Sequence, residues 1–227
     1  MAPRMRRNLG AWRARNGDHE FVFFDDAGQR AWMERNCTDH WPAWRDLALP
    51  AARADLFRYC LLYQLGGVWS DVDVAPARPL REFLPSTIDL AVVHDGGMPD
   101  EGFLYNAFLA ASPGHPALRR AMEIVGRHHR DRLVAPAVMC TGPHVLWRAV
   151  NDTLAGRIRP KTFVGTDEEH GIEYLSFDGS DIVSARQGRV LTAKYDGYLV
   201  DATMHGGEPH YGREVTWCPN GDCNLVS

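Results

Sequence analysis

Two aspartates, Asp71 and Asp73, stand one residue apart in residues 68–74, which read VWSDVDV. If this segment is a strand, alternate side chains share a face, so both carboxylates project to the same side. Hard divalent cations such as Mn²⁺ and Mg²⁺ take oxygen ligands and complete their shells with water and phosphate oxygens. The pair therefore predicts a metal site for a nucleoside diphosphate, although the triplet alone also fits two solvated acids at a strand end.

A second pair of charged residues precedes the aspartates. Residues 51–65 follow Pro50, are rich in Ala, Leu and Arg, and stop at Gly66-Gly67, which predicts a helix with a glycine end. Asp55 and Arg58 are three residues apart and share a face of this helix, where they either pair with each other or point together toward a ligand. The short Gly-Gly connection into the aspartate segment favours the second arrangement.

The other predicted elements alternate along the chain. We expect strands at residues 20–24, 68–74 and 90–94, helices at 27–36, 51–65, 116–129 and 141–154, an ambiguous segment at 103–111, and β-forming sequence from residue 163 onward. Interleaved strands and helices predict an α/β sandwich with a largely parallel sheet.

Composition limits the function classes. The chain has 227 residues, 45% of them hydrophobic, and a net charge of -4, which predicts one soluble domain and gives no basic surface for nucleic acid. The first seventeen residues carry five arginines and no acid. We interpret them as a solvated segment, with weak contact to an anionic membrane surface as the alternative. Without an apolar stretch long enough to span a membrane, we expect a cytoplasmic protein, at most peripheral to the membrane.

The five cysteines are odd in number and scattered, which argues against a disulfide framework. Cys218 and Cys223 alone stand close together, flanking a Pro-Asn-Gly-Asp turn. They either pair or bind a metal, but zinc binding has weak support without a second pair of ligands.

Two adjacent segments resemble a known family. Residues 52–59 (ARADLFRY) and 61–74 (LLYQLGGVWSDVDV) closely resemble the core signature of glycosyltransferase family 32, the family with a DXD sugar-binding motif, which includes capsular-polysaccharide enzymes and has bacterial glucosylating toxins as distant relatives. Residues 12–26, 106–116 and 141–143 are similar to other segments of that family, so the resemblance covers residues 10–150.

The resemblance implies an α/β, GT-A (nucleotide-diphospho-sugar transferase) fold in a single Rossmann-like domain. That domain would span residues 1–227, with its motif core at 50–150 and a less clearly matched part at 160–227. The family begins with an apolar strand under the nucleotide base, and residues 1–9 carry nothing like it. We therefore expect a fold that lacks this first strand.

The resemblance also implies roles for the charged residues. Asp73 would ligate Mn²⁺ or Mg²⁺ directly, while Asp71 would contact the ribose, the sugar or a metal-bound water and belongs to the same metal site. Asp55 would hydrogen-bond to hydroxyls of the donor sugar. Arg58 would lie near the diphosphate, a role that suits a guanidinium because it grips phosphate oxygens bidentately.

Three further residues complete the predicted donor site. Trp69 stands where the family has tyrosine, a change that keeps ring stacking but loses a phenolic hydrogen bond. Asn106 either recognises sugar hydroxyls or is a satisfied turn amide. His205, beside two glycines, is the candidate for the late metal and phosphate histidine of the family, with a surface histidine as the alternative.

These expectations define a function and its rivals. We predict metal-dependent, retaining transfer of a hexose from a UDP- or GDP-sugar to a glycan, lipid-linked or protein acceptor. One alternative is a non-catalytic domain that binds a sugar or nucleotide. Another is a phosphohydrolase of the haloacid dehalogenase type, whose DxDx(V/T) motif residues 71–74 match, but an apolar run should directly precede that motif and Gly66-Gly67 stands there instead.

Overall fold

The computed structural model describes residues 3–98, 102–194, 215 and 217. The chain forms two compact units. The sheet unit comprises Met1–Val22, Gly67–Ser112 and Arg159–Glu208, and the helical unit comprises Phe23–Gly66, Pro113–Ile158 and Pro209–Ser227.

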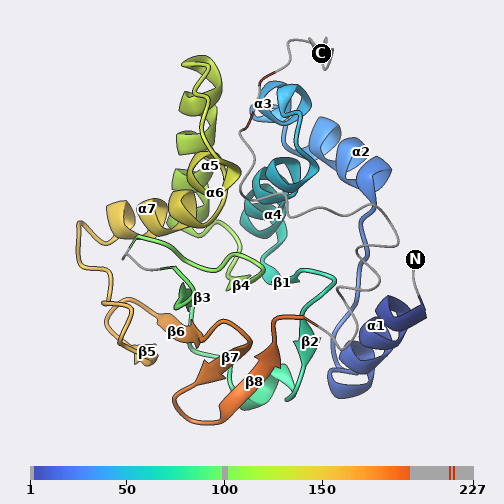
Figure 1. Ribbon diagram of the computed structural model, residues 1–227, viewed down its shortest axis with the longest axis vertical. Helices are drawn as coiled ribbons and strands as arrows, with labels where there is room; N and C mark the ends of the chain where they lie inside the picture. The colour runs from blue at the N-terminus through green and yellow to red at the C-terminus, as the bar shows by residue number, and fades with distance from the viewer. Residues whose placement is uncertain (1–2, 99–101, 195–214, 216, 218–227) are drawn as a thin grey trace. The chain divides into compact units, whose positions relative to one another are not determined.

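The sheet unit contains one mixed sheet and one long helix (Figure 1). The strand order is β1-β4-β3-β6-β7-β8-β2, and β5 pairs with β6 outside this path. The elements are α1 (Pro3–Arg15), β1 (Gly67–Ser70), β2 (Ala75–Pro76), the 3-10 helix η1 (Leu80–Glu82), β3 (Leu90–Asp95), β4 (Phe108–Ala111), β5 (Gly165–Asp167), β6 (Ile172–Phe177), β7 (Asp181–Ser184) and β8 (Gly188–Thr192).

The predicted α/β class is confirmed, but the expectation of a largely parallel sheet is wrong. Among the described strands, β3 and β6 pair in parallel, and the other pairs are antiparallel. The reason lies in the connections of the C-terminal part, because β5, β6, β7 and β8 follow one another through short turns. A short turn can join only antiparallel neighbours, whereas a parallel pair needs a long crossover.

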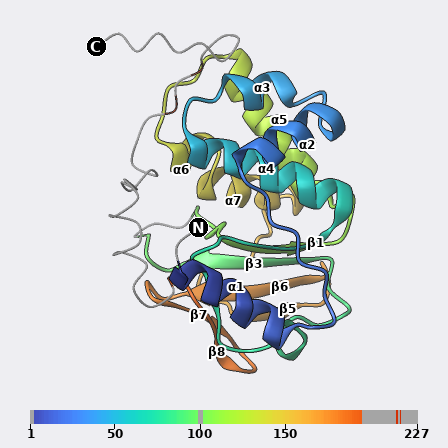
Figure 2. The ribbon, with the colours of Figure 1, turned by 90° about the vertical axis from the view of Figure 1, so that its right-hand side faces the viewer.

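The basic N-terminal segment, which was expected to be solvated, is a helix of the sheet unit that is largely exposed but buries two residues. In α1 the side chains of Asn8 and Trp12 are buried, one turn apart, while arginines such as Arg6 and Arg13 are exposed. Trp12 joins the core of this unit together with residues such as Val74. Figure 2 shows α1 with the strands of this unit, and α1 contacts β2. A count of charges could not reveal this helix face, because the two buried residues stand among exposed arginines.

The helical unit consists of α2 (Asp26–Asn36), α3 (Trp41–Asp46), α4 (Pro50–Leu65), α5 (Pro116–Arg130), α6 (Ala137–Cys140) and α7 (Pro143–Thr153). The predicted helices at 51–65 and 116–129 are confirmed, and helix α4 packs against α2, α3, α5 and α6. Gly66 ends α4 with a φ of +67°, and a Cβ there would lie 2.6 Å from Cδ of Pro113. Only glycine accepts both the positive φ and this close approach.

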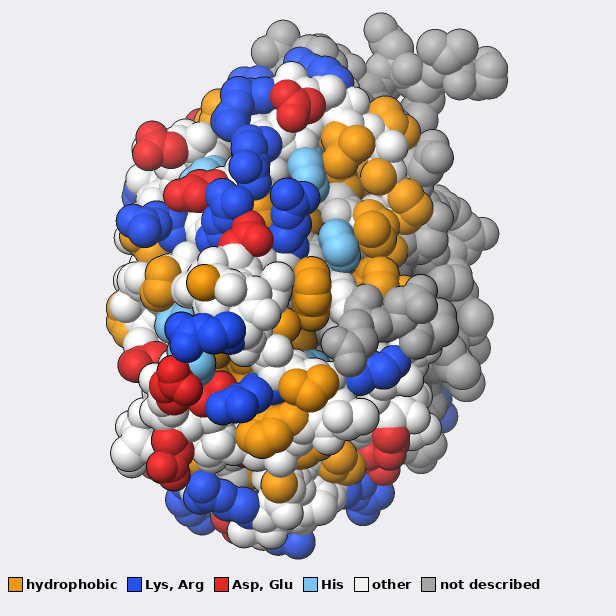
Figure 3. Space-filling model, turned by 90° about the vertical axis from the view of Figure 1, so that its left-hand side faces the viewer, with side chains coloured by type: hydrophobic (Ala, Val, Ile, Leu, Met, Phe, Trp, Pro, Cys, Tyr) orange, Lys and Arg blue, Asp and Glu red, His pale blue; other side chains and the backbone are white. Residues whose placement is uncertain are grey.

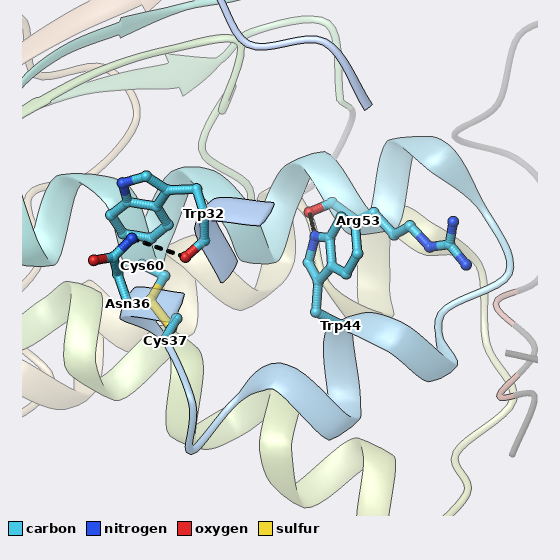
Figure 4. Close-up of a disulfide and its surroundings, with 6 residues drawn as sticks. All are labelled: Trp32, Asn36, Cys37, Trp44, Arg53 and Cys60. Atoms are coloured by element: carbon cyan, nitrogen blue, oxygen red, sulfur yellow. Dashed lines mark hydrogen bonds between the residues drawn. A yellow bond between two sulfur atoms is a disulfide. The ribbon is translucent and has the colours of Figure 1, made fainter. Parts of the chain in front are cut away.

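A disulfide between Cys37 and Cys60 contradicts the expectation drawn from the cysteine count. Cys37 directly follows α2 and Cys60 lies in α4, with their Cα atoms 6.5 Å apart (Figure 4). The packing of α2 on α4 brings the two together, and no spacing rule could show that. Cys140 is a free, buried thiol. Cys218 and Cys223 lie outside the described residues.

One further expectation differs from the structure. Residues 20–25 form no strand, and Val22 and Phe23 are exposed even though the run is apolar. The predicted helix at 141–154 is confirmed as α7, and the short helix α6 precedes it. No described helix has both the length and the apolar character needed to cross a membrane.

Candidate functional site

The DxD segment is a turn and not the end of a strand. Strand β1 stops at Ser70, after pairing with β4 from Gly67 opposite Ala111 to Ser70 opposite Phe108. The backbone N–H of Asp71 then donates to the carbonyl of Ala107 at 2.8 Å, and the N–H of Val74 donates back to the carbonyl of Asp71 at 3.1 Å. The argument from strand alternation is therefore wrong for Asp71 and Asp73, because their backbone has left the strand geometry.

Trp69 orients one of the two aspartates. Its indole Nε1–H donates to Oδ1 of Asp71 at 2.7 Å, and both side chains are partly buried. Sequence reasoning treated tryptophan at this position as the loss of a hydrogen-bonding group. The structure shows that the indole supplies a donor of its own, directed at the DxD segment, and such a second partner typically fixes a metal-binding carboxylate.

Helix α1 holds the backbone of the same turn. The side-chain amide of Asn8 donates from Nδ2 to the carbonyls of Val72, at 3.0 Å, and Val74, at 2.8 Å. The indole N–H of Trp12 donates to the carbonyl of Val74 at 2.8 Å. Asn8 and Trp12 are four residues apart and so lie on one face of the helix.

Sequence reasoning missed the role of these two residues. Trp12 lies in the segment 12–26 that resembles the family, whereas Asn8 lies outside the segments that carry the resemblance. The available signal was an asparagine and a tryptophan at helical spacing inside an otherwise basic segment. Asn16, directly after the end of α1, accepts the N–H of Leu80 at Oδ1, 2.8 Å away, and donates from Nδ2 to the carbonyl of Trp12 at 3.1 Å.

Asn106 lies next to the backbone that anchors the DxD turn. It is 2% exposed and directly precedes Ala107, whose carbonyl accepts the N–H of Asp71. On its other side, the N–H of Tyr105 donates to the carbonyl of Val93 in β3. Trp69, Asp71 and the segment around Asn106 thus form one group within the sheet unit.

Asp55 and Arg58 form a second group, within the helical unit. Both are buried, with 0% and 1% of their side chains exposed, and Nη2 of Arg58 lies 3.3 Å from Oδ1 of Asp55. The hydroxyl of Thr141 donates to Oδ2 of Asp55 at 2.8 Å. Two opposite charges that leave water together require such pairing and hydrogen bonding. Of the two arrangements left open by the sequence, the structure contains the mutual pair.

The start of α7 is built around this carboxylate. The hydroxyl of Tyr59 donates to the carbonyls of Thr141, at 3.0 Å, and Gly142, at 3.2 Å. A Cβ on Gly142 would lie 3.2 Å from Oδ2 of Asp55, so a larger residue would crowd the carboxylate. Burial, with a smaller contribution from the negative charge of Asp55, raises the pKa of the neighbouring Cys140 thiol to about 12. Cys140 therefore stays protonated and is not a nucleophile.

The donor atoms of the DxD turn fit a hard cation. Two carboxylates offer oxygen ligands only, and a site with two protein ligands leaves positions for water and phosphate oxygens, as Mg²⁺ sites commonly do. Among the described residues, the one group of three or more metal-binding side chains close enough to share an ion lies elsewhere, at Asp167, Glu169 and His170. His205, the third predicted ligand, lies outside the described residues.

Comparisons with known proteins agree with the predicted relationship. Residues 3–89 match the family model described as the glycosyltransferase sugar-binding region containing a DXD motif. The chain is 26% identical over 176 residues to an initiation-specific alpha-1,6-mannosyltransferase of Schizosaccharomyces pombe. This match covers 66% of this chain and 44% of that protein. It is 27% identical over 127 residues to inositol phosphoceramide mannosyltransferase 1 of the same organism, covering 55% of this chain and 38% of that protein.

The chain thus spans less than half the length of the curated relatives it matches. Among solved structures, the PaToxG glycosyltransferase aligns with a TM-score of 0.48 and 12% identity over 69% of this chain and 65% of that one, a likeness from which we draw nothing. The matched region begins in α1 and runs through α4 and the DxD turn. The resemblance seen in residues 52–74 is therefore confirmed: residues 3–89 match the model of the glycosyltransferase sugar-binding region that contains the DXD motif.

Proposed function

We propose that the chain transfers a hexose from a nucleoside-diphosphate sugar to an acceptor hydroxyl, in a metal-dependent reaction that retains the configuration of the sugar. The observation that carries this proposal is the DxD turn, held by Trp69, by the carbonyl of Ala107 and by α1, inside the region that matches the family model. Both relatives named above are mannosyltransferases, so mannose is the first sugar to test.

In this proposal Asp73 binds Mn²⁺ or Mg²⁺ directly, with Asp71 and His205 completing the protein's contribution. The ion, when bound, offsets the negative charge that develops on the departing diphosphate. Trp69 holds Asp71 in one orientation through its 2.7 Å hydrogen bond and offers a ring for stacking. Asn106 hydrogen-bonds to the donor through its amide.

We further propose that the two units act as one catalytic domain over residues 1–227. Asp55 and Arg58 would then complete the donor site from α4, with Arg58 on the diphosphate and Asp55 on the sugar hydroxyls. Their mutual ion pair and the hydrogen bond from Thr141 support this role, because they fix both side chains before a ligand arrives.

The acceptor and the compartment belong to the same proposal. One relative is named for a phosphoceramide substrate and the other for an initiating mannosyl transfer, so we propose a lipid-linked or glycan acceptor. The exposed arginines of α1 would support peripheral contact with an anionic membrane. The Cys37–Cys60 disulfide favours an oxidising compartment over the cytoplasm expected from composition. Acidic side chains lie among the basic ones on the face seen in Figure 3, and we propose no nucleic-acid partner.

The test is release of nucleoside diphosphate from UDP- and GDP-sugars, with Mn²⁺ and with EDTA. Asp73→Asn removes a metal ligand and should lower the rate by ~10³-fold or more, since a lost ligand costs several kcal/mol of transition-state stabilisation. The matched control is Glu82→Gln, which also neutralises a carboxylate of the sheet unit, but an exposed one paired with Arg78. Equal, metal-independent release by Asp73→Asn and the unaltered chain would contradict the proposal.

Two further measurements separate the alternative functions. Donor binding measured by calorimetry, without any release, would identify a non-catalytic binding domain. Hydrolysis of p-nitrophenyl phosphate that depends on Asp71 would identify a phosphohydrolase.

A further inference from the structure

Helix α5 ends in a turn that holds apolar side chains in the solvent. The N–H of Arg132 donates to the carbonyl of His129 at 3.2 Å, and the N–H of Leu133 donates to the carbonyl of His128 at 2.9 Å. Arg132 adopts a φ of 52°. Together these features form a Schellman motif, with arginine in place of the usual glycine. The side chains of Leu133 and Val134, which follow directly, are 39% and 57% exposed.

The backbone after this turn is held in place. The carbonyl of Leu133 accepts the indole N–H of Trp217 at 2.8 Å, and the carbonyl of Ala135 accepts the backbone N–H of Val215 at 2.8 Å. Of the seven described large hydrophobic residues that are exposed, three fall between positions 133 and 139, the third being Met139 in α6. Exposed apolar side chains that gather on a fixed backbone indicate a surface that contacts another molecule or a membrane.

The last turn of α5 places positive charges at the same end of the helix. It contains Arg127 and Arg130, whose side chains line a cavity of about 350 Å³ between α3 and α5. Among the described residues, no carboxylate forms an ion pair with either of them, whereas Arg120 pairs with Glu123 and Asp152. The two guanidinium groups are therefore available to an anion, and phosphate oxygens suit their fork of donors.

Acidic side chains are also present, but the charges around His128 are mainly positive. Burial is the largest cause that lowers the pKa of His128, and the positive charges of Arg148 and Arg127 lower it further, against a smaller effect of Asp131. Asp39 lines the cavity as well. On the face seen in Figure 3, basic, histidine and hydrophobic side chains lie next to one another.

We propose that the last turn of α5 and residues 131–139 form a surface that docks on a membrane containing anionic phospholipids. Lipid phosphates bind Arg127 and Arg130, while Leu133 and Val134 enter the boundary between headgroups and acyl chains. Arginines beside an apolar tip fit this occupant, because anionic headgroups attract the charges and the acyl region takes up the apolar side chains. A second copy of the chain fits less well, because a symmetric contact would bring arginines against arginines.

The test is flotation of the full chain with two kinds of vesicle, one of phosphatidylcholine alone and one of equal parts of phosphatidylcholine and phosphatidylserine. Neither donor sugar nor divalent metal is added, so the outcome does not depend on the proposed transfer reaction. Val134→Ser and Arg130→Gln each alter an exposed side chain of the surface. The matched controls are Val22→Ser, at a valine that is 65% exposed, and Arg119→Gln, near the other end of α5.

We expect the chain to bind the vesicles that contain phosphatidylserine and not those of phosphatidylcholine alone. Arg130→Gln should weaken binding about fivefold, because it removes one positive charge near an anionic surface. Val134→Ser should weaken it about tenfold, because it removes apolar surface that enters the membrane. Both controls should bind like the unaltered chain.

Absence of binding to the anionic vesicles, or equal binding to both kinds, would overturn the proposal. Equal binding by all four variants would also overturn it and assign the contact to other residues, such as the arginines of α1. Sedimentation of the chain without vesicles covers the remaining alternative. A dimer that Val134→Ser dissociates would show that the surface joins two copies, which contradicts membrane docking.

Discussion

Replacing Asn8 with alanine tests whether α1 supports the function of the DxD turn. The change removes the two hydrogen bonds from Nδ2 to the carbonyls of Val72 and Val74. The carbonyl of Val74 keeps the indole N–H of Trp12, but that of Val72 loses the amide as a donor. The α1 helix should remain intact, since alanine is the best helix former.

The expected cost follows from these contacts. A buried hydrogen bond contributes roughly 0.5–1.5 kcal/mol net, so two of them give about 2 kcal/mol. For a chain of this size, that loss lowers the melting temperature by roughly 4–8 °C. If most of this energy stabilises the metal-binding geometry of the turn, its loss should raise the half-saturating Mn²⁺ concentration about tenfold, because 1.4 kcal/mol corresponds to a factor of ten.

The control is Asn16→Ala, at the residue that directly follows α1. Asn16 also makes two hydrogen bonds through a buried amide, but to Leu80 and Trp12 and not to the DxD turn. We expect a similar fall in melting temperature and an unchanged Mn²⁺ requirement for release of nucleoside diphosphate. If Asn8→Ala and Asn16→Ala shift the Mn²⁺ requirement equally, or neither shifts it, the link between α1 and the metal site is refuted.

Three further predictions concern stability. Replacing Cys37 and Cys60 with serine should lower the free energy of unfolding by about 3 kcal/mol, as expected for a loop closed over a sequence separation of 23 residues, and urea denaturation measures it. Burial lowers the pKa of His94 from 6.5 to about 4. As the pH falls, the unfolded chain therefore takes up this proton before the folded chain does. The free energy of unfolding should then fall between pH 6.5 and pH 4, by up to about 3 kcal/mol. In His94→Phe that part of the pH dependence should disappear from urea curves, and an unchanged slope would contradict it. Thr141→Val keeps the shape but removes the hydroxyl that donates to Asp55, and should cost roughly 1.5–3 kcal/mol by thermal melting, whereas no change would show that this carboxylate does not need the bond.

Much of the helical unit was predictable because its signals are local. Pro50 and Pro116 begin helices, and Gly66 ends one, through backbone properties that need no partner. The sheet was harder, because strand direction depends on which segments pair. The apolar run at residues 20–24 shows the same limit, since hydrophobicity alone does not supply a neighbouring strand.

The candidate site also has a part that the sequence predicts and a part that it does not. The acids and the arginine could be chosen as candidates because their types and spacing are visible in the sequence. The contacts around these residues could not be predicted. Along the sequence, Thr141 is 86 residues from Asp55, and Asn8 is 64 residues from Val72. Contacts across such separations leave no local pattern. The Cys37–Cys60 disulfide was missed for the same reason, although it links only neighbouring helices.

The arrangement of the DxD turn explains why the recognised region begins so far before the motif. A turn of four residues cannot fix its own carbonyls, because its N–H and C=O groups have too few local partners. Here the N–H of Asp71 is held by the carbonyl of Ala107, and the carbonyls of Val72 and Val74 are held by Asn8 and Trp12. A loop fixed from both sides keeps its carboxylates in place before a metal or a donor arrives, which lowers the ordering cost of binding. Asn8 and Trp12 therefore support the proposed site by holding the backbone of this turn.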